Sequence, residues 1–143
     1  MKPPPVSFPY DIRPSALFGT IHRPVAQVEL YSWRFRRWLA CTMVVDTGAD
    51  YCVLPSRIAL HLGIERGQCE RYVASGIGGQ QSVWLSRKVR LRLGPWELRV
   101  PMGIVEREDL PPLLGRYHCL DVFDLRFRNF VTTFSRLFPR DTR

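Results

Sequence analysis

The sequence lacks the features that would place it in a membrane, in a secretory route or around a metal ion. The apolar run WLACTMVV at residues 38–45 is too short to span a bilayer, and residues 1–15 carry prolines where a secretory signal would need an apolar core. The four cysteines lie far apart in the chain and form no C-x-x-C pair of the kind that binds zinc. We therefore expect a soluble, cytoplasmic protein without a membrane contact or a metal, whose cysteines are buried, reduced thiols.

Length and charge narrow the class further. With 143 residues the chain is long enough for one domain with a core and too short for an enzyme of two lobes. Its 45% of apolar and 24% of charged residues are typical of a globular protein. The 21 basic residues outnumber the 13 acidic ones, and this net charge of +8 permits contact with nucleic acid without demonstrating it.

The chain divides into an arm, a domain and a tail. Residues 1–24 are rich in proline and have no sustained period, so we expect an extended arm or linker there. A folded domain is expected over residues 25–137, and a short tail over residues 138–143.

A β pattern dominates the domain. Apolar runs predict strands at 25–33 and 36–45, and the segment PSRIALHLG at 55–63 predicts a short helix that ends at its glycine. The segment LGPW at 93–96 predicts a tight hairpin turn. The segment SGIGG at 75–79 predicts a flexible hairpin tip that carries one apolar side chain.

In the segment RKVRLRL at 87–93, basic residues face one side of the predicted strand and apolar residues face the other. We interpret the basic side as a solvated sheet face rather than a nucleic-acid surface, because no aromatic residue interleaves on it to stack a base.

The last part of the chain predicts a short buried strand at LLG (113–115), one or two helical turns at 117–124 and a closing strand at 127–134. No internal repeat is present. The predicted fold class is therefore all-β with one or two short helices.

The segment TMVVDTGADYCVLP at 42–55 reads as a strand, a polar turn and a second strand, which puts the Asp46 carboxylate at the edge of the core. Asp46 is the only acid of the chain in a D-T-G context. From the residues alone, such an aspartate can also be a turn residue that only caps its own backbone.

Three motifs resemble the retropepsin-like aspartic proteases, the single-domain class found in retroviruses and as short bacterial members. They are VVDTGADYCVLP for the catalytic turn, GIGG for the flap and LLGRYHCLDVFDLRF for a strand that leads into a helix. The resemblance runs from about Val28 to Phe134. It implies a closed β-barrel of the acid-protease fold, with one lobe per chain, active as a C2 homodimer.

The resemblance also implies an aspartic endopeptidase. Peptide hydrolysis by this route needs two carboxylates that share one proton, one to activate a water and one to act as the acid. Because the chain has a single D-T-G, a second copy must supply the second Asp46, and a C2 axis would bring the two together. The partners implied are a second copy of the chain and a peptide substrate, and no metal or organic cofactor is implied.

Relatives suggest roles for the neighbours of Asp46. Thr47 would hydrogen-bond across the dimer interface, and Gly48 would leave room for substrate and water. Ala49 and Asp50 would hold the substrate backbone, and Asp50 would also pair with Arg116. The flap would close over the peptide and exclude water. Its residues would be Gly76, Ile77, Gly78 and Gly79.

The chain departs from the family pattern at two places. Tyr51 and Cys52 stand where a small or hydroxyl residue is expected, and Tyr117, His118 and Cys119 follow the LLGR segment. These changes leave the catalytic atoms untouched, and we expect them to alter the shape of the substrate pocket.

Two other functions stay open on the sequence alone. One is a dimerisation or peptide-binding module of the same fold with little turnover, in which Asp46 is structural. The other is a basic module associated with nucleic acid, suggested by RFRR, SRKVRLRL and DLRFR.

Ala49 predicts the pH range in which the two carboxylates work. In relatives with Ser or Thr at this position, a hydroxyl can donate to the catalytic carboxylate and favour its charged form, whereas alanine cannot. We therefore expect cleavage under mildly acidic conditions, at higher pH than in pepsin-like enzymes. The measurement is the initial rate of peptide cleavage against pH, and a bell-shaped profile centred below about pH 3 would contradict the expectation.

Overall fold

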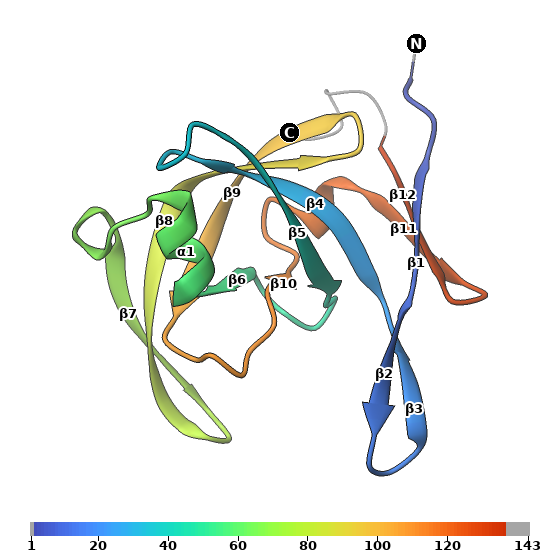
Figure 1. The fold of residues 1–143 in the computed structure, drawn as a ribbon, viewed down its shortest axis with the longest axis horizontal. Coiled ribbons are helices and arrows are strands. Elements are labelled where there is room, and N and C mark those ends of the chain that lie inside the picture. The colour runs from blue at the N-terminus through green and yellow to red at the C-terminus, as the bar shows by residue number, and fades with distance from the viewer. Residues whose placement is uncertain (1, 137–143) are drawn as a thin grey trace.

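The computed structural model describes residues 2–136 and shows a closed β-barrel (Figure 1). Strands β4, β5, β10, β6, β9 and β8 follow one another in one sheet, and the ring closes because β4 also pairs with β8. Their bounds are β4 Val25–Ser32, β5 Arg37–Val45, β6 Cys52–Pro55, β8 Gly79–Leu93, β9 Trp96–Val105 and β10 Leu113–Leu114. The expected all-β barrel with short helical segments is confirmed.

Further elements extend the barrel. Strand β7 (Glu70–Gly76) pairs with the first half of β8 and forms a long hairpin with it. A separate three-stranded sheet has the order β1-β12-β11, and β2 pairs with β3 in a two-stranded sheet. These strands are β1 Val6–Pro9, β2 Asp11–Ser15, β3 Gly19–Arg23, β11 Asp124–Arg128 and β12 Val131–Ser135.

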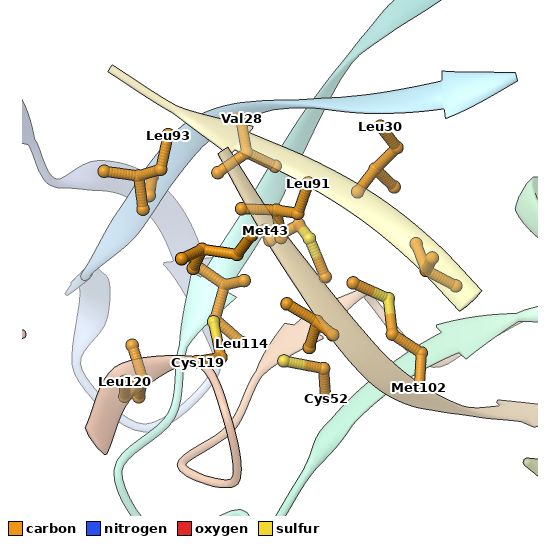
Figure 2. Packing of buried hydrophobic residues seen from close by; sticks show 14 of the residues in the cluster. Val28, Leu30, Met43, Cys52, Leu91, Leu93, Met102, Leu114, Cys119 and Leu120 are labelled. Atoms are coloured by element: carbon orange, nitrogen blue, oxygen red, sulfur yellow. The ribbon is translucent and has the colours of Figure 1, made fainter. Parts of the chain in front are cut away.

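The core follows the alternation seen in the sequence. Val89, Leu91 and Leu93 of β8 are buried, and Val28 and Leu30 of β4 meet them inside the barrel (Figure 2). Each fully buried side chain of this size stabilises the fold by about 1.5–3 kcal/mol relative to exposure. The barrel therefore supplies a rigid framework for the segments at its ends.

The predicted helix is confirmed as α1 (Ser56–Leu62). Gly63 ends it in the left-handed conformation with φ 75°, and a Cβ there would lie 2.8 Å from the backbone nitrogen of Arg34. The expected helical turns near residue 120 reduce to one 3-10 turn, η2 (Leu120–Val122), and a second such turn, η1, covers Arg66–Gln68.

Both predicted hairpin turns are present, since Leu93 pairs with Trp96 and Gly76 pairs with Gly79. The single closing strand expected at 127–134 is wrong. The chain turns at Asn129 and Phe130, both with positive φ, and forms the hairpin β11–β12 instead. Two consecutive residues with positive φ give the tight turn that fits the twist of a hairpin.

The segment expected to be an extended arm or linker forms three strands, β1 to β3, within residues 6–23. Strand β1 pairs with β12, from Val6 opposite Phe134 to Pro9 opposite Val131, and Phe8 packs edge to face on Phe134 at 5.8 Å. The expected tail at 138–143 lies outside the described residues.

The prediction that no aromatic residue lies on the basic face of β8 is wrong. The guanidinium of Arg90 lies 4.6 Å from the ring centre of Tyr31, and that of Arg92 lies 4.4 Å from the ring centre of Trp38. These rings come from the neighbouring β4–β5 hairpin, so the β8 sequence alone could not show them. Arg90 also pairs with Glu97 at 3.2 Å and Arg92 with Glu29 at 2.8 Å, which offsets their charge.

The cysteines are buried only in part. Cys52 and Cys119 are buried as expected, whereas Cys41 and Cys69 are partly exposed. Burial raises the pKa of the Cys41 thiol to about 11, so this thiol is protonated at neutral pH. No helix within residues 2–136 is long and apolar enough to cross a membrane.

Candidate active site

Asp46 lies at the end of β5, at one end of the barrel. Strand β5 runs parallel to β10, with Val45 opposite Leu114, and the Asp46 N–H donates to the Leu114 carbonyl at 3.0 Å. The Asp46 residue is half-buried. The apolar run before the motif therefore places the carboxylate at the edge of the core, as the sequence predicts.

Hydrogen bonds inside the turn orient this carboxylate. The Gly48 N–H donates to Asp46 Oδ1 at 3.0 Å, and the Ala49 N–H donates to the Asp46 carbonyl at 3.1 Å. A Cβ on Gly48 would lie 3.3 Å from the same Oδ1, so a side chain there would crowd the carboxylate. Oδ2 receives no hydrogen bond from the described residues and is left for another partner.

A second segment fastens the turn from far along the chain. The Arg116 N–H donates to the Ala49 carbonyl at 3.0 Å, and the Tyr117 N–H donates to the Asp50 carbonyl at 2.9 Å. Together with the Asp46–Leu114 bond, these contacts form what we name the clasp, which joins residues 46–51 to residues 114–117. The clasp fixes the turn by its backbone.

The structure pairs Asp50 with Arg116, at 2.5 Å between Oδ1 and Nη2. Their side chains are 81% and 46% exposed, so the guanidinium is not buried within one subunit. An ion pair this exposed contributes little stability, about 0–1 kcal/mol. The clasp therefore depends on its backbone hydrogen bonds, and the ion pair lies on its solvent-exposed side.

Gly115 and two cysteines fill the space beneath the turn. A Cβ on Gly115 would overlap the carbonyl group of Tyr51, so the two backbones meet only because this residue is glycine. The Gly115 N–H donates to Cys52 Sγ at 3.3 Å. Cys119 lies beside Cys52 in the core (Figure 2), and its hydrogen bond with Cys52 together with burial raises the pKa of its thiol.

A pocket of about 500 Å³ opens beside the turn. Tyr51 and Tyr117, two of the positions that depart from the family pattern, line it. The other lining residues are Asp50, Tyr72, Val73, Ala74, Val83, Leu85, Arg87 and Pro101. Most come from the β7–β8 hairpin, where the sequence predicted a role in substrate contact only for the tip.

The four predicted flap residues lie together at the tip of the β7–β8 hairpin. Gly79 has φ 98°, a conformation that favours glycine, and Ile77 is fully exposed. Figure 1 shows that the hairpin projects from the barrel. The structure thus brings Asp46–Asp50 and Arg116 into one cluster and leaves the tip as a separate, unpacked element.

An ion pair ties the two strands of this hairpin together at its base. Arg87 donates to Glu70 through Nε at 2.9 Å and through Nη2 at 3.2 Å, and the Tyr72 hydroxyl donates to the same carboxylate. The Arg87 guanidinium, with the Tyr72 hydroxyl, lowers the pKa of Glu70 to about 2. The base of the hairpin is therefore tied while its tip is free.

Residues 2–136 contain no group of three or more His, Cys, Asp or Glu side chains placed to hold a metal ion.

Comparison with known proteins agrees with this geometry. The family model described as "Aspartyl protease" matches residues 39–117, more than half of the chain. The structure is similar to the crystal structure of a retropepsin-like aspartic protease from Rickettsia conorii, with a TM-score of 0.60 and 14% identity, over 92% of this chain and 99% of that chain. At this identity the likeness shows the retropepsin-like fold. No curated protein matches the chain.

Replacing Gly115 with alanine tests the clasp. We expect Gly115→Ala to destabilise the fold by about 1–3 kcal/mol, because the added methyl group overlaps backbone that cannot move without breaking the clasp. Thermal unfolding should show a Tm lower by roughly 4–12 °C. The control is Gly67→Ala, where an added Cβ meets nothing within 4 Å. Equal Tm values for the two variants would contradict the role given to Gly115.

The Glu70 pair predicts a pH dependence of stability. A carboxyl whose pKa is about 2 when folded and about 4.5 when unfolded stabilises the fold above about pH 4.5 and loses that contribution as the pH falls towards 2. We expect Glu70→Gln to lower the Tm slightly above about pH 5, with the difference from wild type disappearing towards pH 2. Glu65→Gln is the control, since the exposed Glu65 makes no ion pair with the described residues. A Tm difference that is constant from pH 2 to 7 would exclude this account of the pair.

Proposed function

This chain belongs to the aspartyl protease family, and we propose that it is an endopeptidase that hydrolyses peptide bonds with two Asp46 carboxylates, one from each subunit of a homodimer. The observation that carries the proposal is the clasped D-T-G turn, which holds one oriented, half-buried carboxylate at an open end of the barrel. One carboxylate can act as a base or as an acid, and peptide hydrolysis by this route needs both at once.

The chemistry assigns interchangeable roles to the two carboxylates. The ionised Asp46 takes a proton from a water, which attacks the peptide carbonyl carbon, while the protonated Asp46 donates its proton to the carbonyl oxygen. In the resulting tetrahedral diol, the nitrogen takes the proton from the Asp46 that received it from water, while the other Asp46 takes a proton from a diol hydroxyl. The C–N bond then breaks to give an acid and an amine, and the pair again holds one proton. This cycle needs the two carboxylates within hydrogen-bond reach of one water.

The remaining residues of the turn suit this arrangement. Thr47 is exposed in the single subunit, so its hydroxyl is free to bond across the interface. Gly48 keeps the space beside Oδ1 clear for water and substrate. An extended peptide would lie between the turn and the β7–β8 hairpin, with side chains at alternate positions recognised by the pocket that contains Tyr51 and Tyr117.

The peptide-binding alternative also has an observation in its favour. The bond from the Gly48 N–H to Asp46 Oδ1 is the self-capping contact expected of an aspartate with a structural role. The protease needs a carboxyl group at position 46 that can gain and lose a proton, whereas the binding module does not. A substitution that keeps the hydrogen bond to Gly48 and removes the carboxyl group therefore separates the two functions.

The substitution Asp46→Asn distinguishes the protease from the binding module. The amide oxygen can still accept the Gly48 N–H, so we expect the fold and the dimer to survive, while cleavage of an unstructured protein mixture between about pH 4 and 7 falls at least about 100-fold. Asp121→Asn, at an exposed carboxylate of η2, is the matched control and should cleave like wild type. Undiminished cleavage by Asp46→Asn would overturn the protease mechanism, and a dimer that cleaves nothing even as wild type would favour the binding module.

A further inference from the structure

The hairpin β2–β3 projects from the body of the protein (Figure 1). Its five pairs run from Asp11 opposite Arg23 to Ser15 opposite Gly19, and within residues 2–136 neither strand pairs with any other. A two-stranded hairpin is marginally stable in water unless its face is covered. Its isolation in one subunit therefore suggests that a cover comes from elsewhere.

The side chains near the tip agree with this. Leu17 and Phe18 at the turn are 85% and 76% exposed, and Ile12 on β2 is also exposed. Single exposed apolar residues are ordinary, but a leucine and a phenylalanine adjacent at the end of a projecting hairpin are typical of a contact surface.

The base of the hairpin lies beside the catalytic turn. The Pro24 carbonyl, one residue after β3, accepts the Val45 N–H at 2.9 Å, and Val45 directly precedes Asp46. Strand β4 then begins at Val25, which pairs with Val44. The hairpin thus leaves the barrel at the same end as the carboxylate.

The base is also anchored, so the hairpin has a defined direction. The Tyr10 N–H donates to the Phe130 carbonyl at 2.8 Å. The rings of Tyr10 and His22 pack on the Phe130 ring with centres 5.8 and 4.2 Å apart. The unexpected turn between β11 and β12 therefore carries the aromatic side chain that holds both ends of the hairpin.

We propose that β2–β3 is a dimerisation arm whose apolar tip, Leu17 and Phe18, packs against a second copy of this chain. The inference rests on the proposed function, which requires two Asp46 carboxylates close enough to share a proton. An element that starts beside Val45 then lies next to the two-fold axis, and its five residues of strand extend about 16 Å from its base. A second copy is therefore the partner nearest to the arm, and two-fold symmetry places both tips in the same contact.

The test removes the apolar tip. Leu17→Ser/Phe18→Ser should fold normally, because both side chains are exposed, and should weaken the dimer at least about 100-fold in sedimentation over a concentration series. Cleavage should fall in step with the lost dimer. The matched control is Phe35→Ser/Leu60→Ser, which removes a phenylalanine and a leucine that are 47% and 60% exposed. Phe35 lies in the β4–β5 turn, at the opposite end of β5 from Asp46.

The outcomes separate the arm from the enzyme mechanism. If the arm variant dimerises like wild type, or if wild type is monomeric at every concentration, the arm is excluded even where the protein cleaves peptides. If the variant is monomeric and cleaves as well as wild type, the arm is supported and the shared two-carboxylate site is wrong.

A second measurement does not depend on weakening the dimer. A benzophenone side chain at position 18 should cross-link a tagged chain to an untagged one on irradiation, since the tip lies against the partner. Cross-links confined within single chains would overturn the proposal.

Discussion

The clasp is the interaction on which the rest of the structure depends. Backbone bonds from Leu114, Arg116 and Tyr117 hold a turn more than sixty residues earlier in the chain, and they do so at the point where β10 lies between β5 and β6. Without β10 the barrel would not close on this side, and Asp46 would sit on an ordinary surface loop. Gly115 makes the approach of the two backbones possible.

One barrel carries one such carboxylate, so the proposed two-carboxylate chemistry would need a second subunit. Several elements at this end of the barrel are unpacked within residues 2–136: Thr47 is exposed, Ile77 is fully exposed and the β2–β3 hairpin pairs with no other strand. At the other end, Tyr31 and Trp38 of the β4–β5 hairpin pack against Arg90 and Arg92. Exposed apolar surface therefore lies where a second subunit and a peptide would bind in the proposed dimer.

The parts of the fold that could be predicted are those that local patterns determine. The alternation in β8, the glycine that ends α1 and the D-T-G turn each follow from short-range geometry, and the structure places them as expected. The Asn129–Phe130 turn had only a weak local signal, because asparagine adopts positive φ more often than most residues whereas phenylalanine rarely does. The pairing of β1 with β12 joins the two ends of the chain, and no local pattern encodes a register over that separation.

The site shows the same division. The residues of the motif were identifiable, whereas the pocket was not, because its walls come from strands 70–76 and 79–93 as well as from the turn. Tyr51 illustrates how a departure from the family pattern is accommodated. A Cβ at position 103 would lie 2.7 Å from Cε2 of the Tyr51 ring, so the ring rests against Gly103 of β9. Tyr51 thereby forms a wall of the pocket, and the requirement for glycine at 103 links the shape of the pocket to the packing of the barrel.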